Sequence, residues 1–144
     1  MKIFIACSKY SYKYVDKIKL QLEFLGHEVI LPNFFDTPMI EEEIKENKSK
    51  EEHIEFCRKS FLESQNKAKE SDAILVLNFE REKQINVFRN DSITRNNKCP
   101  NYIGGATFLE MYDAYLNGNK IYLYNDFPSK TSVSGILYDE IEGM

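Results

Sequence analysis

Four short segments rich in apolar residues have the pattern of strands. They occupy residues 2–6, 27–31, 73–79 and 120–125. The first and third are almost continuously apolar, which is typical of parallel strands covered on both faces. The last alternates apolar and polar side chains, as a strand also does. Because stretches with helical spacing separate these segments, the pattern predicts an α/β fold with a parallel sheet.

Helices are expected between the strands. Apolar residues from Val15 to Leu25 recur at helical spacing, and Gly26 is placed to end that helix. Residues 39–71 are highly charged and lack glycine and proline. They predict two helices, divided near residues 47–50, with largely solvated faces.

A further helix is expected to begin at Gly104 and Gly105 and to end at Gly118. Glu110 falls near its start, on the side that carries Ala106 and Ala114. The residues expected to face the core recur at helical spacing and are Phe108, Met111, Tyr112 and Tyr115.

Two segments have weaker patterns. Residues 80–102 read as a long polar connection, which we interpret as mobile with a lid role. Residues 136–141 read as a short amphipathic helix. Together, the elements predict a flavodoxin/Rossmann-like three-layer sandwich with strand order 2-1-3-4, or 2-1-3-4-5 if a fifth strand is present.

Composition narrows the class of protein. A length of 144 residues predicts a single domain, residues 1–144, and a net charge of −4 excludes a strong nucleic-acid footprint. We see no apolar run of membrane-spanning length and no signal peptide, so we expect a cytoplasmic protein with no membrane contact. Three irregularly spaced cysteines suggest reduced thiols. We judge His27 and His53 to lack a metal-ligand partner at useful spacing, and expect no metal site.

Polar residues gather where the predicted strands end. Ser8, Tyr10 and Tyr12 lie between the first strand and its helix, where free backbone N–H groups favour anions and hydroxyl-bearing ligands. An ordinary loop capped by Ser11 is the alternative. Asn78 lies at the carboxyl end of the third strand. The segment lacks a Gly-x-Gly-x-x-Gly motif and a Walker lysine, which disfavours dinucleotide and ATP binding.

Three further positions carry candidate chemistry. Gly104 and Gly105 allow a ligand to approach the backbone closely, and Glu110 places a carboxylate beside them. The alternative is a capping box, in which Glu110 returns a hydrogen bond to a helix that starts at Thr107. Two adjacent aromatic residues, Phe34 and Phe35, either stack on a planar base or are buried under the next helix.

The segments KIFIACS, LGHEVILP, SDAILVLN and especially NYIGGATFLEMYDAYLNGNKIYLYN resemble the nucleoside 2-deoxyribosyltransferase-like family, and within it a group of small proteins. The resemblance covers most of the chain. It implies a doubly wound sheet, a site at the strand carboxyl ends, a homodimer, and cleavage of an N-glycosidic bond by a helix-borne glutamate at Glu110. Substrate contacts are then expected at Ser8, Tyr10, Tyr12, Asn78, Gly104 and Gly105.

Two features depart from the family pattern. Ser64 stands where characterised transferases carry an aspartate near the base, and the glycine-to-glutamate spacing differs by one residue. We therefore keep two functions open: cleavage or transfer of the glycosidic bond of a nucleoside or nucleotide, and a non-catalytic nucleotide sensor. Hydrolysis of the cytokinin-activating type ranks lower, because its Gly-Gly-x-Gly-Thr-x-x-Glu motif is one residue short here. No cofactor is expected for any of them.

Overall fold

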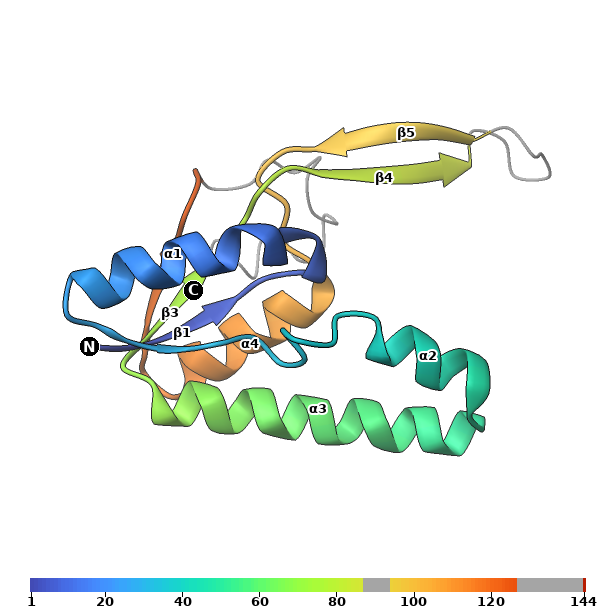
Figure 1. Ribbon diagram of the computed structural model, residues 1–144, viewed down its shortest axis with the longest axis horizontal. Coiled ribbons are helices and arrows are strands. Elements are labelled where there is room, and N and C mark those ends of the chain that lie inside the picture. Colours follow the sequence, from blue (N-terminus) through green and yellow to red (C-terminus); the bar gives the residue numbers. More distant parts are fainter. Residues whose placement is uncertain (87–93, 127–143) are drawn as a thin grey trace.

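A four-stranded parallel sheet forms the middle layer of the protein (Figure 1), as the sequence predicted. The computed structural model describes residues 1–86, 94–126 and 144. The sheet has the order β2-β1-β3-β6, and all three neighbouring pairs are parallel. Its strands are β1 (Lys2–Ala6), β2 (Glu28–Ile30), β3 (Ala73–Val76) and β6 (Lys120–Leu123). All but β1 are shorter than expected.

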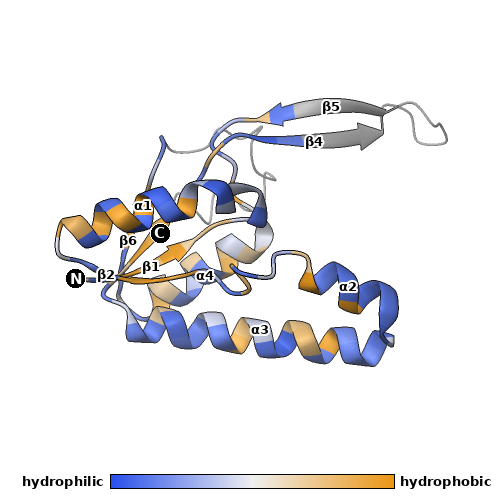
Figure 2. Ribbon diagram, viewed as in Figure 1, coloured by the Kyte–Doolittle hydropathy of each residue, from blue (hydrophilic) through white to orange (hydrophobic). Residues whose placement is uncertain are grey.

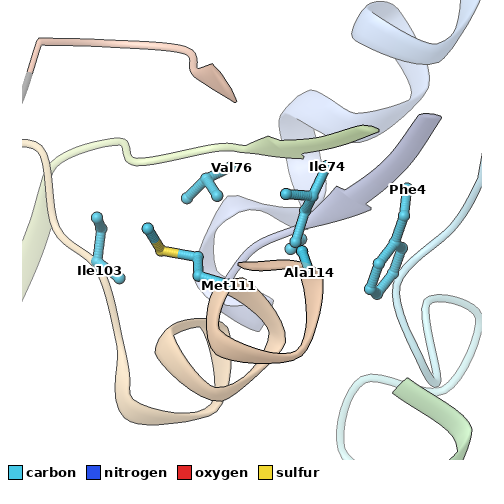
Figure 3. Packing of buried hydrophobic residues seen from close by; sticks show 7 residues of the cluster. Phe4, Ile74, Val76, Ile103, Met111 and Ala114 are labelled. Carbon is cyan, nitrogen blue, oxygen red and sulfur yellow. The ribbon is translucent and has the colours of Figure 1, made fainter. Parts of the chain in front are cut away.

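Helices cover both faces of this sheet. The helices among the described residues are η1 (Lys9–Ser11), α1 (Tyr12–Phe24), α2 (Ile40–Asn47), α3 (Lys50–Glu70) and α4 (Gly105–Leu116). On one face, α1 buries Val15 and Ile18 against the strands. On the other, Met111 and Ala114 of α4 pack against Ile74 and Val76 of β3 (Figure 3). The result is a three-layer, flavodoxin-like arrangement.

The boundaries of the helices follow from local chemistry. Gly26 and Gly118 have φ values of 89° and 76°, the left-handed conformation expected after a helix. α2 and α3 divide at residues 48–49 as predicted, and Ser49 Oγ accepts a hydrogen bond from the Glu52 backbone N–H at 3.1 Å. In Figure 2 both helices are largely hydrophilic, whereas β1 and β2 are hydrophobic.

The expected connection at residues 80–102 is instead built around an antiparallel hairpin. Its strands are β4 (Arg81–Asn86) and β5 (Thr94–Cys99), and they project from the rest of the molecule (Figure 1). Their sequences, REKQIN and TRNNKC, are too polar to give a strand pattern. The observed register pairs Arg81 with Cys99 and Asn86 with Thr94, and the polar sequences explain why the segment was expected to be a loop. The proposed lid role stays a prediction, and the expected helix at residues 136–141 lies outside the described residues.

The rotation of α4 about its axis also differs from the expectation. Its buried residues are Thr107, Met111 and Ala114, whereas Tyr112 and Tyr115 are exposed. The error arises because tyrosine counts as apolar in a periodicity pattern although its ring often lies at the surface. Among the described residues, no helix is both long and apolar enough to cross a bilayer.

Candidate functional site

A cavity of about 380 Å³ lies where β1 and β2 end and α4 begins. Figure 1 shows the start of α4 beside the η1 turn. Six of the seven predicted site residues line this cavity, and they are Ser8, Tyr10, Tyr12, Gly104, Gly105 and Glu110. A volume in this range suits a small-molecule ligand.

The carboxylate of Glu110 forms one end of a chain of hydrogen bonds. Ser64 Oγ donates to Glu110 Oε1 at 3.1 Å, and Asn33 Nδ2 donates to Ser64 Oγ at 2.8 Å. Asn33 is held in turn by a bond from its Nδ2 to the Ser60 carbonyl at 2.9 Å, and its backbone carbonyl accepts from Tyr12 Oη at 2.9 Å. The chain fixes the orientation of the carboxylate within the cavity.

The capping-box interpretation of Glu110 is wrong. The residue at the N-cap of α4 is Gly104, so Thr107 lies within the first turn of the helix, where its side chain is buried. A capping glutamate returns to the backbone of a residue three positions earlier. Here the carboxylate reaches across to α3 and accepts from Ser64 instead.

The electrostatics of the cavity place Glu110 near its titration point at neutral pH. Burial raises its pKa to about 7, although the Ser64 hydrogen bond and the Lys67 ammonium both lower it. Two neighbours respond to the same environment. Burial and, to a smaller extent, the Glu110 charge raise the pKa of the Cys7 thiol, which therefore stays protonated and is a poor nucleophile. Burial likewise raises the pKa of Tyr12.

An aromatic wall flanks the cavity. Phe34 stacks on Phe56 of α3, with ring centroids 5.0 Å apart and planes at 27°, and both residues line the cavity. Phe34 has a φ of 56°, a conformation that costs a residue with a side chain about 1–2 kcal/mol. Phe35 instead meets Tyr12 edge-on at 5.6 Å within the core of the α1 face. Phe34 therefore lines the cavity, where stacking on a base stays a prediction, and Phe35 is partly buried on the α1 side rather than under the following helix.

Arg81 at the base of the hairpin is a site residue that sequence reasoning missed. Its guanidinium lies 4.0 Å from the centroid of the Tyr10 ring and 5.0 Å from that of Tyr102, whose hydroxyl accepts from Arg81 Nη1 at 3.0 Å. Arg81 Nε is buried and has no partner within the described part of the chain. The sequence offered one signal for Arg81, which is that it follows the end of β3 by only a few residues. Because the segment was expected to be a loop, that signal did not fix the position of Arg81 in space.

The two glycines have different surroundings. A Cβ at Gly104 would lie 3.4 Å from the Tyr102 ring, an ordinary to tight contact. A Cβ at Gly105 would meet no described atom within 4 Å. Gly105 therefore leaves the start of α4 open to a ligand, as close approach to the backbone requires.

Asn78 lies away from the cavity, so its predicted role in substrate binding does not fit. Its side chain is fully buried, and Nδ2 donates to the carbonyls of Asn125 at 3.2 Å and Asp126 at 3.0 Å. Its Oδ1 accepts from the Asn125 N–H at 2.8 Å. The residue joins the end of β3 to the segment after β6. Ser11 occupies the N-cap position of α1, as the alternative expected, but its side chain makes no capping hydrogen bond among the described contacts. Ser8 Oγ instead accepts from the Tyr10 N–H at 3.2 Å, at the start of η1.

Comparison of the chain with protein-family models, with curated proteins and with solved structures found no match. Function is therefore argued from the geometry of the cavity.

Proposed function

We propose that the protein cleaves or transfers the N-glycosidic bond of a nucleoside or nucleotide, with Glu110 as the nucleophile or the stabiliser of the oxocarbenium-like transition state. The observation that carries the proposal is the position of the Glu110 carboxylate. It lies in a cavity of ligand size, is oriented by Ser64, and shares that cavity with an aromatic wall. A carboxylate held beside an anomeric carbon is what glycosidic cleavage requires.

The other residues of the cavity supply binding. The rings of Phe34 and Phe56 offer apolar surface against which a planar base can stack. Ser8, Tyr10 and Tyr12 line the cavity, and their hydroxyls would orient the sugar. The Arg81 guanidinium lines the cavity, and its positive charge suits a 5′-phosphate and favours nucleotides over nucleosides.

The reaction then follows a double displacement. A Glu110 oxygen attacks C1′ of the sugar, the C1′–N bond breaks, and the base leaves with the bonding electrons. The base takes its proton from a solvent water, because the Ser64 hydroxyl hydrogen is already donated to Glu110 and does not face the leaving group. Water or a second base next attacks C1′ and releases Glu110. Hydrolysis and transfer differ only in this last nucleophile.

A nucleotide sensor on the same fold is the second candidate. The observation that favours it is the serine at position 64, where the resemblance implies a catalytic aspartate. The Ser64 hydroxyl donates its hydrogen to Glu110, so it does not protonate a leaving group. In this case the cavity binds the ligand without turning it over.

The test is a panel of purine and pyrimidine nucleosides and their 5′-monophosphates, incubated with the protein and followed by chromatography of the free base. We expect base release, faster for monophosphates than for the matching nucleosides. Calorimetric binding without base release across the panel would establish the sensor instead. Neither binding nor release would reject both candidates.

We also propose a homodimer, as the family resemblance implies, with the contact on the exposed faces of α3 and α4 rather than on the side of α4 that carries Ala106 and Ala114. Ala114 is fully buried against the sheet and is not available to a partner. Apolar side chains of α3 and α4 instead line one shallow groove at the surface, and each is 42–48% exposed: Phe61, Leu62, Leu109 and Tyr112. Burying them against a second copy would remove this apolar surface from water.

Leu62→Glu is expected to shift the protein from dimer to monomer, because a charge would be buried in the apolar contact. Light scattering at micromolar concentration measures the mass. Leu20→Glu is the matched control, since Leu20 lies on α1 and is 65% exposed. A monomeric wild type, or equal effects of the two variants, would contradict this face.

A further inference from the structure

Three metal-ligating side chains meet where α2 packs against the first half of α3. His53 and Cys57 lie four residues apart on α3, so they project from one side of the helix, and Glu41 approaches from α2. Their ligand atoms all lie within 4.8 Å of one another. The expectation that His53 has no metal-ligand partner is therefore wrong. The spacing to Cys57 was visible in the sequence, but Glu41 is brought in only by the turn between the helices.

The separations of the three atoms can be compared with a tetrahedral zinc centre. Zinc bonds of about 2.3 Å to sulfur, about 2.0–2.1 Å to nitrogen and about 2.0–2.2 Å to oxygen, at tetrahedral angles, place the ligand atoms about 3.6 Å (S–N), about 3.4 Å (N–O) and about 3.6 Å (S–O) apart. The observed distances are 3.5 Å from Cys57 Sγ to His53 Nε2 and 3.4 Å from His53 Nε2 to Glu41 Oε1. Cys57 Sγ lies 3.9 Å from Glu41 Oε1.

We propose that Glu41, His53 and Cys57 form a binding site for a divalent transition metal, with zinc as the best fit. The first two separations agree with a zinc tetrahedron to about 0.1 Å, and a small rotation of the exposed Glu41 side chain closes the third. The mixed S, N and O donors select zinc over magnesium and calcium, which prefer oxygen alone. Binding replaces the thiol proton of Cys57 with the metal.

Accessibility supports this assignment. The side chains of His53 and Glu41 are 24% and 58% exposed, so an ion can enter and one coordination position is left for water or a ligand. Glu41 also lines the cavity that holds Glu110, so the metal would lie at the rim of that cavity. It would fix α2 to α3 and thereby hold one wall of the cavity in place. The site stands on its own geometry and does not depend on the glycosidic chemistry.

The test uses the full chain without a histidine tag, treated with a chelator and dialysed. Titration with Zn²⁺ by calorimetry should give one site per chain, and Mg²⁺ should give none. Co²⁺ in place of Zn²⁺ should show a thiolate-to-cobalt charge-transfer absorption, which reports that a cysteine is a ligand. Zn²⁺ should also raise the melting temperature, because it binds the folded chain.

Variants locate the site. Cys57→Ser should remove the cobalt absorption, and His53→Gln and Glu41→Gln should each weaken Zn²⁺ binding roughly tenfold or more, since loss of a ligand costs at least as much as loss of its supporting contacts. The matched controls are His27→Gln and Glu43→Gln, which lie outside the cluster. All five changes are at positions that are not buried, so the folds should persist, which circular dichroism checks. Absence of Zn²⁺ binding in the wild type, or binding and absorption unchanged in Cys57→Ser, would overturn the proposal.

Discussion

Glu110→Gln is expected to lose base release by on the order of a thousandfold or more, because the charge that stabilises the oxocarbenium-like transition state is removed. Glutamine keeps the shape of the side chain and accepts the Ser64 hydrogen bond through its amide oxygen. Ligand binding should therefore change far less than turnover. The measurements are chromatography of the free base for rate and calorimetry for affinity, on whichever substrate the wild type releases fastest.

The pH dependence of the wild type tests the same group. Burial raises the pKa of Glu110 to about 7, and only the ionised form is a nucleophile. Base release should therefore rise as pH increases through about 7 and then level off. A rate that instead falls above pH 7 would assign Glu110 as a general acid. Asp16→Asn is the control, because Asp16 is an exposed carboxylate of α1 that lies outside the cavity. Full activity in Glu110→Gln would reject the mechanism.

The same substitution should stabilise the fold at alkaline pH. In the folded protein the pKa of Glu110 is about 7, above the ordinary value of 4.5. The folded state then binds the proton more tightly than the unfolded state, so wild-type stability falls as pH rises from about 4.5 to 7. Glutamine has no charge to bury. At pH 8, Glu110→Gln should be more stable than the wild type by about 1–3 kcal/mol, and the difference should vanish at pH 4. Urea unfolding at the two pH values measures it.

The fold was predictable because strand position depends on a strong, local signal. The continuous apolar runs around Phe4 and Ile74 are almost entirely buried, and short runs of that kind have few other uses. The hairpin carries no such signal, because the side chains of REKQIN and TRNNKC are polar at nearly every position. The hairpin is observed as local antiparallel pairing of residues 81–86 with residues 94–99, which the pattern of apolar and polar side chains does not indicate.

The site was predictable to the extent that topology fixes it. Parallel strands bring their carboxyl ends to one edge, which is why Ser8 and Glu110 meet in one cavity. The partners of Glu110 depend on the exact rotation of helices. Ser64 reaches Glu110 because α3 packs against α4 with that face inward, and Asn33 joins them from the loop after β2. Periodicity predicts a helix and the approximate direction of its buried face. An error in that direction placed Tyr112 in the core, whereas it is exposed.

Replacing Asn78 tests whether this polar residue is structural or binds the ligand. We expect the replacement to lower the stability of the fold strongly. Asn78→Ala removes three side-chain hydrogen bonds and leaves the Asn125 N–H and the carbonyls of residues 125 and 126 without those partners. Each lost bond to a buried group costs about 0.5–1.5 kcal/mol, so the free energy of unfolding should fall by about 2–4 kcal/mol. Asn47→Ala is the matched control, because Asn47 is exposed and donates one bond to the Glu43 carbonyl. It should change stability by less than about 0.5 kcal/mol.

Urea denaturation measures both variants, and base release or ligand binding is measured under conditions where each remains folded. The side chain of Asn78 faces the segment after β6, so the folded Asn78→Ala protein should keep its affinity and its rate. A variant with unchanged stability but weakened binding would restore the original interpretation of Asn78 as a substrate contact. We expect the opposite result, which is lowered stability with unchanged binding. It would mean that Asn78, although it lies at the carboxyl end of a strand, stabilises that edge of the sheet rather than contacting the ligand.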